Sequence, residues 1–99
     1  MPAEDNQLML PPSVISDPNA FEILRVWAAH GRQHVVIHSG LKAGPEGFGY
    51  MLAQLAMHGA RIFHQRERML LEQALERIKA GFDEEWSNPT GDAEGDILK

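Results

Sequence analysis

The sequence predicts a small α+β protein whose elements follow the order helix, strand, helix, helix. Three observations support this class. The stretch from Gln33 to Ser39 is rich in β-branched residues, as strands are. Residues 67–86 carry an apolar stripe with the period of an α-helix. The length of 99 residues allows one small domain, which we place at residues 13–88 between flexible segments 1–12 and 89–99.

The first expected helix runs from Pro18 to His30. Asp17 can cap it by accepting hydrogen bonds from the first backbone amides, and Pro18 suits a first helical position, where no amide donor is needed. Gly31 would end the helix in a left-handed conformation. At 100° per residue, one broad face gathers apolar side chains, namely Phe21, Ile23, Leu24, Trp27 and Ala28.

The segment Gln33–Ser39 is the one clear strand in the sequence. A strand has backbone donors and acceptors that need partners, and the sequence offers no obvious second strand. We therefore expect this strand to pair with the same strand of a second copy. As an alternative, residues 8–10 or 14–15 could fold back as a second strand and permit a monomer, although Pro11 and Pro12 lie between them.

The pattern His-Val-Val-Ile-His gives that self-pairing a register. If two copies pair antiparallel about Val36, each His34 lies opposite the partner's His38. We take His34, Val36 and His38 as the candidate dimer-interface residues. Protonating the facing imidazoles would make them repel, so this dimer would weaken below about pH 6.

Two more helices are expected, from Pro45 to His64 and from Glu67 to Trp86. In one continuous helix, the second apolar stripe would lie roughly 120° from the first. A short turn in the polar stretch 64–68 lets both stripes face one core, so we favour two helices. The stripe of the last helix consists of Leu70, Leu71, Ala74, Leu75, Ile78, Phe82 and Trp86.

Composition narrows the classes of function. The formal net charge is −5, and acidic residues are interleaved with the basic ones, so the footprint of a nucleic-acid-binding protein is missing. No run of 18 apolar residues could span a membrane. The chain has no cysteine, and its first ten residues carry acids where a secretory signal has basic residues. We expect a cytoplasmic protein.

The histidines do not predict a metal site. His34 and His38 are four residues apart, which in a strand separates them by about 13 Å, too far to chelate one ion. The neighbouring acids Asp83, Glu84 and Glu85 point around their helix in different directions. No nucleophile motif accompanies them. We expect no cofactor and favour a protein that is not an enzyme.

Two blocks of residues resemble a known family. The first is Asp17-Pro18-Asn19-Ala20 followed by Leu24-Arg25-Val26-Trp27 and Gly31-Arg32-Gln33-His34-Val35, and the second is the run from Glu84 to Thr90. Together they resemble domain-of-unknown-function family 5076, a group of short bacterial, mostly alphaproteobacterial, proteins. The similarity covers roughly residues 10–90. It implies a single domain of bacterial origin and no particular activity.

Two classes of function stay open. The first is a non-enzymatic interaction or scaffold protein that acts as a homodimer, with or without a further protein partner. The second is a small-ligand binder or enzyme with a pocket beside the strand, lined by His34, His38 or His58. Converging histidines in a pocket would favour the second class, and a flat apolar patch would favour the first.

Overall fold

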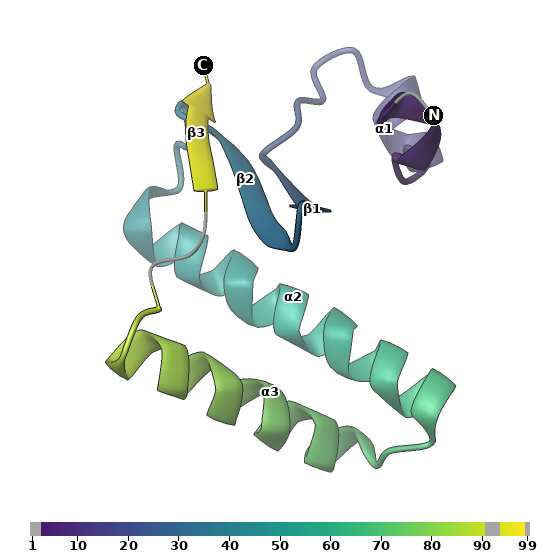
Figure 1. The fold of residues 1–99 in the computed structure, drawn as a ribbon. Coiled ribbons are helices and arrows are strands. Elements are labelled where there is room, and N and C mark those ends of the chain that lie inside the picture. Colours follow the sequence, from purple (N-terminus) through teal and green to yellow (C-terminus); the bar gives the residue numbers. More distant parts are fainter. Residues whose placement is uncertain (1–2, 91–93, 99) are drawn as a thin grey trace.

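The computed structural model describes residues 3–90 and 94–98 and confirms the α+β class. A sheet of β1 (Leu24–Ala29), β2 (Arg32–His38) and β3 (Glu94–Leu98) lies over a hairpin of two helices (Figure 1). The helices are α2 (Gly44–Glu67) and α3 (Leu71–Ser87). The 3-10 turn η1 (Ala3–Asn6) and the short α1 (Pro12–Ser16) precede the sheet.

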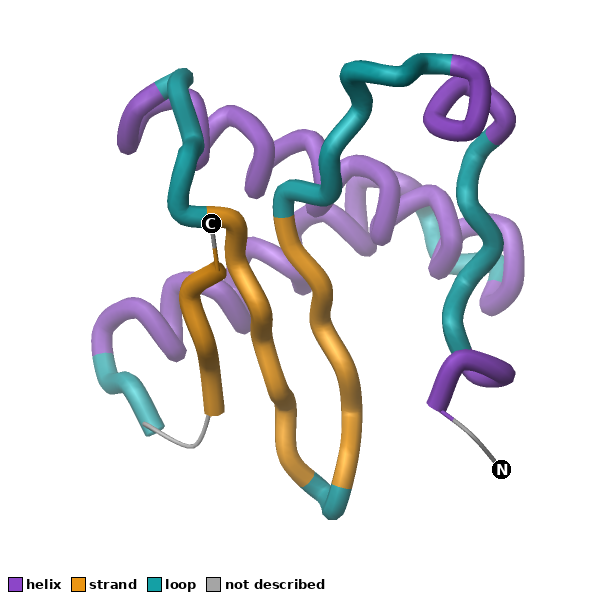
Figure 2. The backbone as a smooth tube through the Cα atoms, turned by 90° about the horizontal axis from the view of Figure 1, so that it is seen from above, coloured by secondary structure: helices purple, strands orange, loops and turns teal. Residues whose placement is uncertain are grey.

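The sheet has the order β1-β2-β3, so β2 is its central strand. β1 runs antiparallel to β2, and β3 runs parallel to β2 (Figure 2). The parallel arrangement arises because α2 and α3 together carry the chain from the end of β2 back to the start of β3.

The helix expected from Pro18 to His30 is wrong, because residues 24–29 form β1 instead. His30 and Gly31 are the two loop residues between the paired Ala29 and Arg32. Their φ angles of 53° and 71° are both positive. Positive φ at both loop positions defines the type I′ turn, whose twist matches that of a β-hairpin. The glycine expected to end a helix therefore turns one strand into the next.

The expectation of a single strand is also wrong, and β2 has partners on both sides within its own chain. Neither alternative second strand forms, since residues 8–10 are irregular and residues 14–15 lie in α1. Residues 94–98 form β3 inside the range 89–99 that we expected to be a tail, while 91–93 and 99 lie outside the described residues. The segment Glu94–Leu98 contains Gly and Asp, which are rare in strands, so pairing with β2 rather than intrinsic propensity places it in the sheet.

The expectation of two helices is confirmed. α2 ends where Arg68 takes a left-handed conformation with φ of 57°, and α3 begins three residues later. His64 closes this turn, because its Nδ1–H donates to the carbonyl of Met69 at 2.7 Å. The break between the two helices therefore falls at the polar stretch 64–68, where the angle between the two apolar stripes predicts a turn.

Small residues form the contact between α2 and α3. Ala60 is 0% exposed and Ala74 is 1% exposed, and they are the fully buried apolar residues among those described. A Cβ built on Gly59 would lie 3.8 Å from Cδ1 of Ile78, so the two helices approach closely there. No large side chain of the described chain is fully buried. The fold therefore leaves most of its bulky apolar residues at least partly exposed.

Candidate functional site

The structure places the three candidate interface residues on the central strand, where each has a partner in its own chain. His34 Nε2–H donates to the carbonyl of Ala29 at 3.1 Å. The amide of Gly40 donates to Nδ1 of His38 at 2.8 Å. Val36 lies opposite Arg25 in the β1–β2 ladder. Because β2 has a strand on each side, the proposed pairing of two β2 strands about Val36 is overturned.

The pH response derived from that register loses its basis as well. His34 lies opposite Trp27 in the sheet. The ring of His38 contacts the ring of Phe21, with centroids 4.9 Å apart. The two imidazoles therefore have neighbours other than a partner's imidazole. Within residues 3–90 and 94–98, no three histidine or acidic side chains gather closely enough to hold a metal ion.

The unpaired edge of the sheet next to the N-terminal segment belongs to β1. The amide of His38 donates to the carbonyl of Ile23 at 2.8 Å, which makes Ile23 and His38 a hydrogen-bonded pair. Hydrogen-bonded pairs alternate along an antiparallel ladder, so Arg25, Trp27 and Ala29 also bond to β2. Leu24, Val26 and Ala28 consequently direct their amides and carbonyls away from the sheet.

Those outward backbone groups receive no hydrogen bond from any described residue. Natural sheets shield such edges with prolines, lysines, bulges or a covering segment. Here the three outward-bonding residues are Leu24, Val26 and Ala28, all apolar, and Val26 is 54% exposed. The edge thus combines free backbone hydrogen-bonding groups with apolar side chains.

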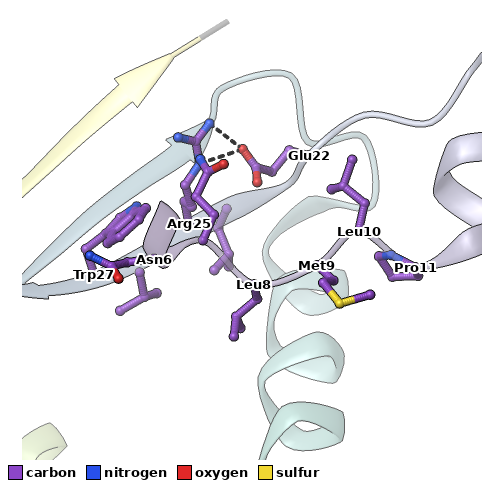
Figure 3. A pocket seen from close by; sticks show the side chains of 11 residues that line it. Asn6, Leu8, Met9, Leu10, Pro11, Glu22, Arg25 and Trp27 are labelled. Atoms are coloured by element: carbon purple, nitrogen blue, oxygen red, sulfur yellow. Dashed lines mark hydrogen bonds and ion pairs between the residues drawn. The ribbon is translucent and has the colours of Figure 1, made fainter. Parts of the chain in front are cut away.

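An open groove of about 610 Å³ runs between β1 and the segment Asn6–Pro11 (Figure 3). Leu8 and Met9 are 94% and 92% exposed, so this segment makes little contact with the rest of the chain. The groove is mostly apolar, and its lining residues are Asn6, Gln7, Leu8, Met9, Leu10, Pro11, Glu22, Leu24, Arg25, Val26 and Trp27.

One ion pair stands at the rim of this groove. Arg25 Nη2 lies 2.7 Å from Glu22 Oε1, and Nε of the same arginine donates to that oxygen at 2.8 Å (Figure 3). Both side chains are about half exposed. An exposed pair of this kind contributes little to stability, so Arg25 is free to change partners at small cost.

A smaller groove of about 280 Å³ lies near the turn between the helices. Its lining residues are Phe63, Glu67, Met69, Ala74, Arg77 and Ile78. None of the histidines expected beside the strand lines either this groove or the one at β1. The pocket beside the sheet exists, but it is built from other residues.

The helices also expose large apolar side chains. Phe82 and Trp86 stack at the end of the α3 stripe, with ring centroids 5.6 Å apart, and Trp86 is 75% exposed. On α2, Tyr50, Leu55 and Ile62 are exposed. Scattered exposed apolar residues are normal, whereas the adjacent rings of Phe82 and Trp86 form a small apolar patch.

Sequence reasoning missed the β1 edge, although a signal was present. Val26 and Trp27 belong to the residue types enriched in strands, and His30-Gly31 provides a two-residue loop before the next strand. Histidine is one of the residues enriched at positive φ. The helical period of Phe21, Leu24 and Trp27, together with the cap at Asp17, pointed to a helix instead.

A comparison with models of protein families shows which family the chain belongs to. The family model described as "Domain of unknown function (DUF5076)" matches residues 7–90. The chain belongs to this family. The match confirms the family that the two sequence blocks resemble, and it covers the sheet hairpin and both long helices.

A solved structure from the photosynthetic bacterium Rhodopseudomonas palustrus CGA009 has the same fold and is 32% identical in sequence. It aligns with a TM-score of 0.69 over 83% of this chain and 94% of that one, and it carries the provisional name pyruvate dehydrogenase. The comparison with curated proteins found no match. Within the part of the chain that is described, neither long helix is apolar enough to cross a bilayer.

Proposed function

We propose that this member of the DUF5076 family is a small non-enzymatic interaction protein that acts as a homodimer. The observation that carries the proposal is the large surface left open by the single chain. Its accessible surface is 8906 Å², whereas a monomeric protein of 11.1 kDa is expected to expose about 5,700 Å². The excess is about 3,200 Å² per chain.

Two further features support the same reading. The radius of gyration is 15.5 Å, against about 13 Å for a compact domain of 100 residues. The fully buried apolar residues among those described are two alanines, so the hydrophobic contribution to stability is small for a lone chain. A stable protein interface removes about 800 Å² from each partner, and the excess surface is several times that area.

The ligand-binding alternative has less support in the geometry. A pocket that used His34, His38 or His58 would need these side chains in its wall, and neither groove has them. The name of the Rhodopseudomonas protein suggests an enzyme acting on pyruvate, whose carboxylate a cation would bind. Arg25 lines the groove beside β1, but it is already paired with Glu22. We therefore place the interaction function first.

Sedimentation equilibrium tests the homodimer directly. We expect a mass of twice 11.1 kDa at micromolar concentration, and a melting temperature that rises with protein concentration because dimerisation stabilises the folded state. A monomeric mass together with a concentration-independent melting temperature would refute the proposal. We place this homodimer in the cytoplasm, since a chain without cysteine suits a reducing compartment.

Turnover provides the complementary test. The purified protein, supplied with pyruvate, thiamine diphosphate, magnesium and an electron acceptor, is expected to release no carbon dioxide above a protein-free control. Release that scales with protein concentration would favour the enzyme alternative over the interaction function.

A further inference from the structure

The outer edge of β1 carries backbone donors and acceptors that no described residue binds. We propose that β1 pairs antiparallel with β1 of a second copy about a twofold axis at Val26, so that two three-stranded sheets join into one. This inference rests on the homodimer proposed above and names its interface.

The backbone selects the register. Leu24, Val26 and Ala28 direct their hydrogen-bonding groups outward. With the axis at Val26, each Leu24 faces the second copy's Ala28 and the two valines face each other, giving about six interchain hydrogen bonds. With the axis moved by one residue, to Arg25 or to Trp27, the two strands form about four interchain hydrogen bonds. The register at Val26 therefore satisfies the most backbone groups.

Side chains select the same register. With the axis at Val26, Arg25 of one copy lies directly opposite Trp27 of the other, and the reverse pair forms as well. A guanidinium beside an indole is attractive. An axis at Arg25 would instead place two guanidinium groups opposite each other, which is destabilising. Among the described residues, the Arg25 side chain is bound by an exposed ion pair with Glu22 alone, so it can turn toward the second copy's tryptophan.

A second copy also fits the space and the area. The groove of about 610 Å³ is lined by Leu24 and Val26, whose backbone groups point outward, so an added strand would lie in it. Twofold pairing of two β1 edges uses the same edge of both copies, so contacts through β1 stop at two chains. The excess surface of about 3,200 Å² per chain exceeds the roughly 800 Å² that a stable interface needs from each partner.

Two proline variants separate the outer edge from the inner ladder. In Val26→Pro, the lost amide faces outward, and edge strands tolerate proline in that orientation. We expect the far-ultraviolet circular dichroism of the wild type with a mass of 11.1 kDa in light scattering. Arg25→Pro is the matched control, because its amide bonds to β2, and we expect it to unfold the hairpin.

Cysteine cross-linking tests the register in a chain that has no cysteine of its own. In the proposed pair, the two Val26 Cα atoms lie about 5.5 Å apart, within the range of a disulfide. Val26→Cys should therefore form a covalent dimer on mild oxidation. Ala28→Cys is the matched control, because the two Ala28 positions lie about 14 Å apart along the paired strands and should not cross-link.

The outcomes distinguish this interface from the homodimer itself. A wild-type monomer refutes both. A wild-type dimer that persists in folded Val26→Pro refutes the β1 interface but not the homodimer. The interface would then lie on the helices, and replacing both Phe82 and Trp86 by serine should dissociate the dimer. If Val26→Pro fails to fold, the cysteine pair decides: equal cross-linking at both positions, or none at Val26, overturns the proposed register.

Discussion

The α2–α3 hairpin and the β1–β2 hairpin are both antiparallel pairs, but they differ in what remains unsatisfied after pairing. A helix forms its backbone hydrogen bonds internally. The open side of α2 or α3 therefore offers apolar side chains, which do not fix the orientation of a partner. The open side of β1 offers backbone donors and acceptors in fixed order at Leu24, Val26 and Ala28. Helical surface can strengthen an association, whereas a strand edge also dictates its orientation and register.

The largest expected effect tests the inner ladder of the β-hairpin. Val36 lies in the central strand β2, and in the ladder its amide donates to the carbonyl of Arg25 in β1. Val36→Pro removes this amide. We expect a loss of about 3 kcal/mol in the free energy of unfolding, enough to unfold much of the protein. Urea denaturation followed by circular dichroism measures it. A variant as stable as Val26→Pro would mean that the inner and outer edges of β1 do not differ.

The next effect tests the packing of the helical hairpin. Ala74→Leu forces a larger side chain into the contact between α2 and α3, where the alanine is 1% exposed. We expect a cost of about 1–3 kcal/mol, because the neighbouring helix must shift. Ala80→Leu is the matched control on the exposed side of α3, and its unfolding free energy should change by less than about 0.5 kcal/mol. Equal losses in the two variants would contradict close packing at Ala74.

A pair of glycine substitutions should have opposite signs in the two hairpins. Gly31→Ala places a side chain at φ of +71° in the β-turn and should destabilise the protein by about 1 kcal/mol. Gly81→Ala lies within α3, where an added Cβ would meet nothing within 4 Å, and should stabilise it by about 0.5–1 kcal/mol. Melting temperatures compared at one protein concentration give the signs. Stabilisation by both would argue against a turn that requires positive φ.

The smallest effect concerns the exposed charges. Lys79 Nζ lies 2.8 Å from Asp83 Oδ2 on the outer face of α3, and Lys79→Ala should cost less than about 0.5 kcal/mol. Arg25→Ala should cost as little within the chain, yet raise the dissociation constant of the homodimer if Arg25 contacts the second copy's Trp27. Analytical ultracentrifugation of the two variants compares them. An unchanged constant in both would remove Arg25 from the interface.

The helical half of the fold could be predicted from the sequence because its signal is local. The stripe of α3 and the phase difference between the two helices follow from 3.6-residue periodicity, and the break at Arg68 lies beside the predicted turn. Of the two buried alanines, Ala74 lies on the predicted stripe of the last helix. No distant residue had to be known for these predictions.

The sheet half could not be predicted in the same way because its partners are distant or ambiguous. Residues 21–28 fit a helical period and show no clear strand alternation, and the hairpin turn uses His30 in place of the more usual Asn. β3 has little strand propensity and is placed by β2. The candidate residues His34, Val36 and His38 therefore lie on β2, one strand away from the open edge of β1.

The parallel pairing of β2 with β3 has a consequence for the order of folding. Residue 94 begins its strand 56 positions after residue 38 ends β2. Both hairpins join elements that are consecutive in the sequence and can form early, whereas β3 can join β2 only after the long connection between these two strands closes. Until then β2 itself is an edge, with the amides and carbonyls of Gln33, Val35 and Ile37 open to another chain. A nascent or partly unfolded molecule thus exposes the hydrogen-bonding groups of β2 as well as those of β1, and pairing with residues 94–98 covers those of β2.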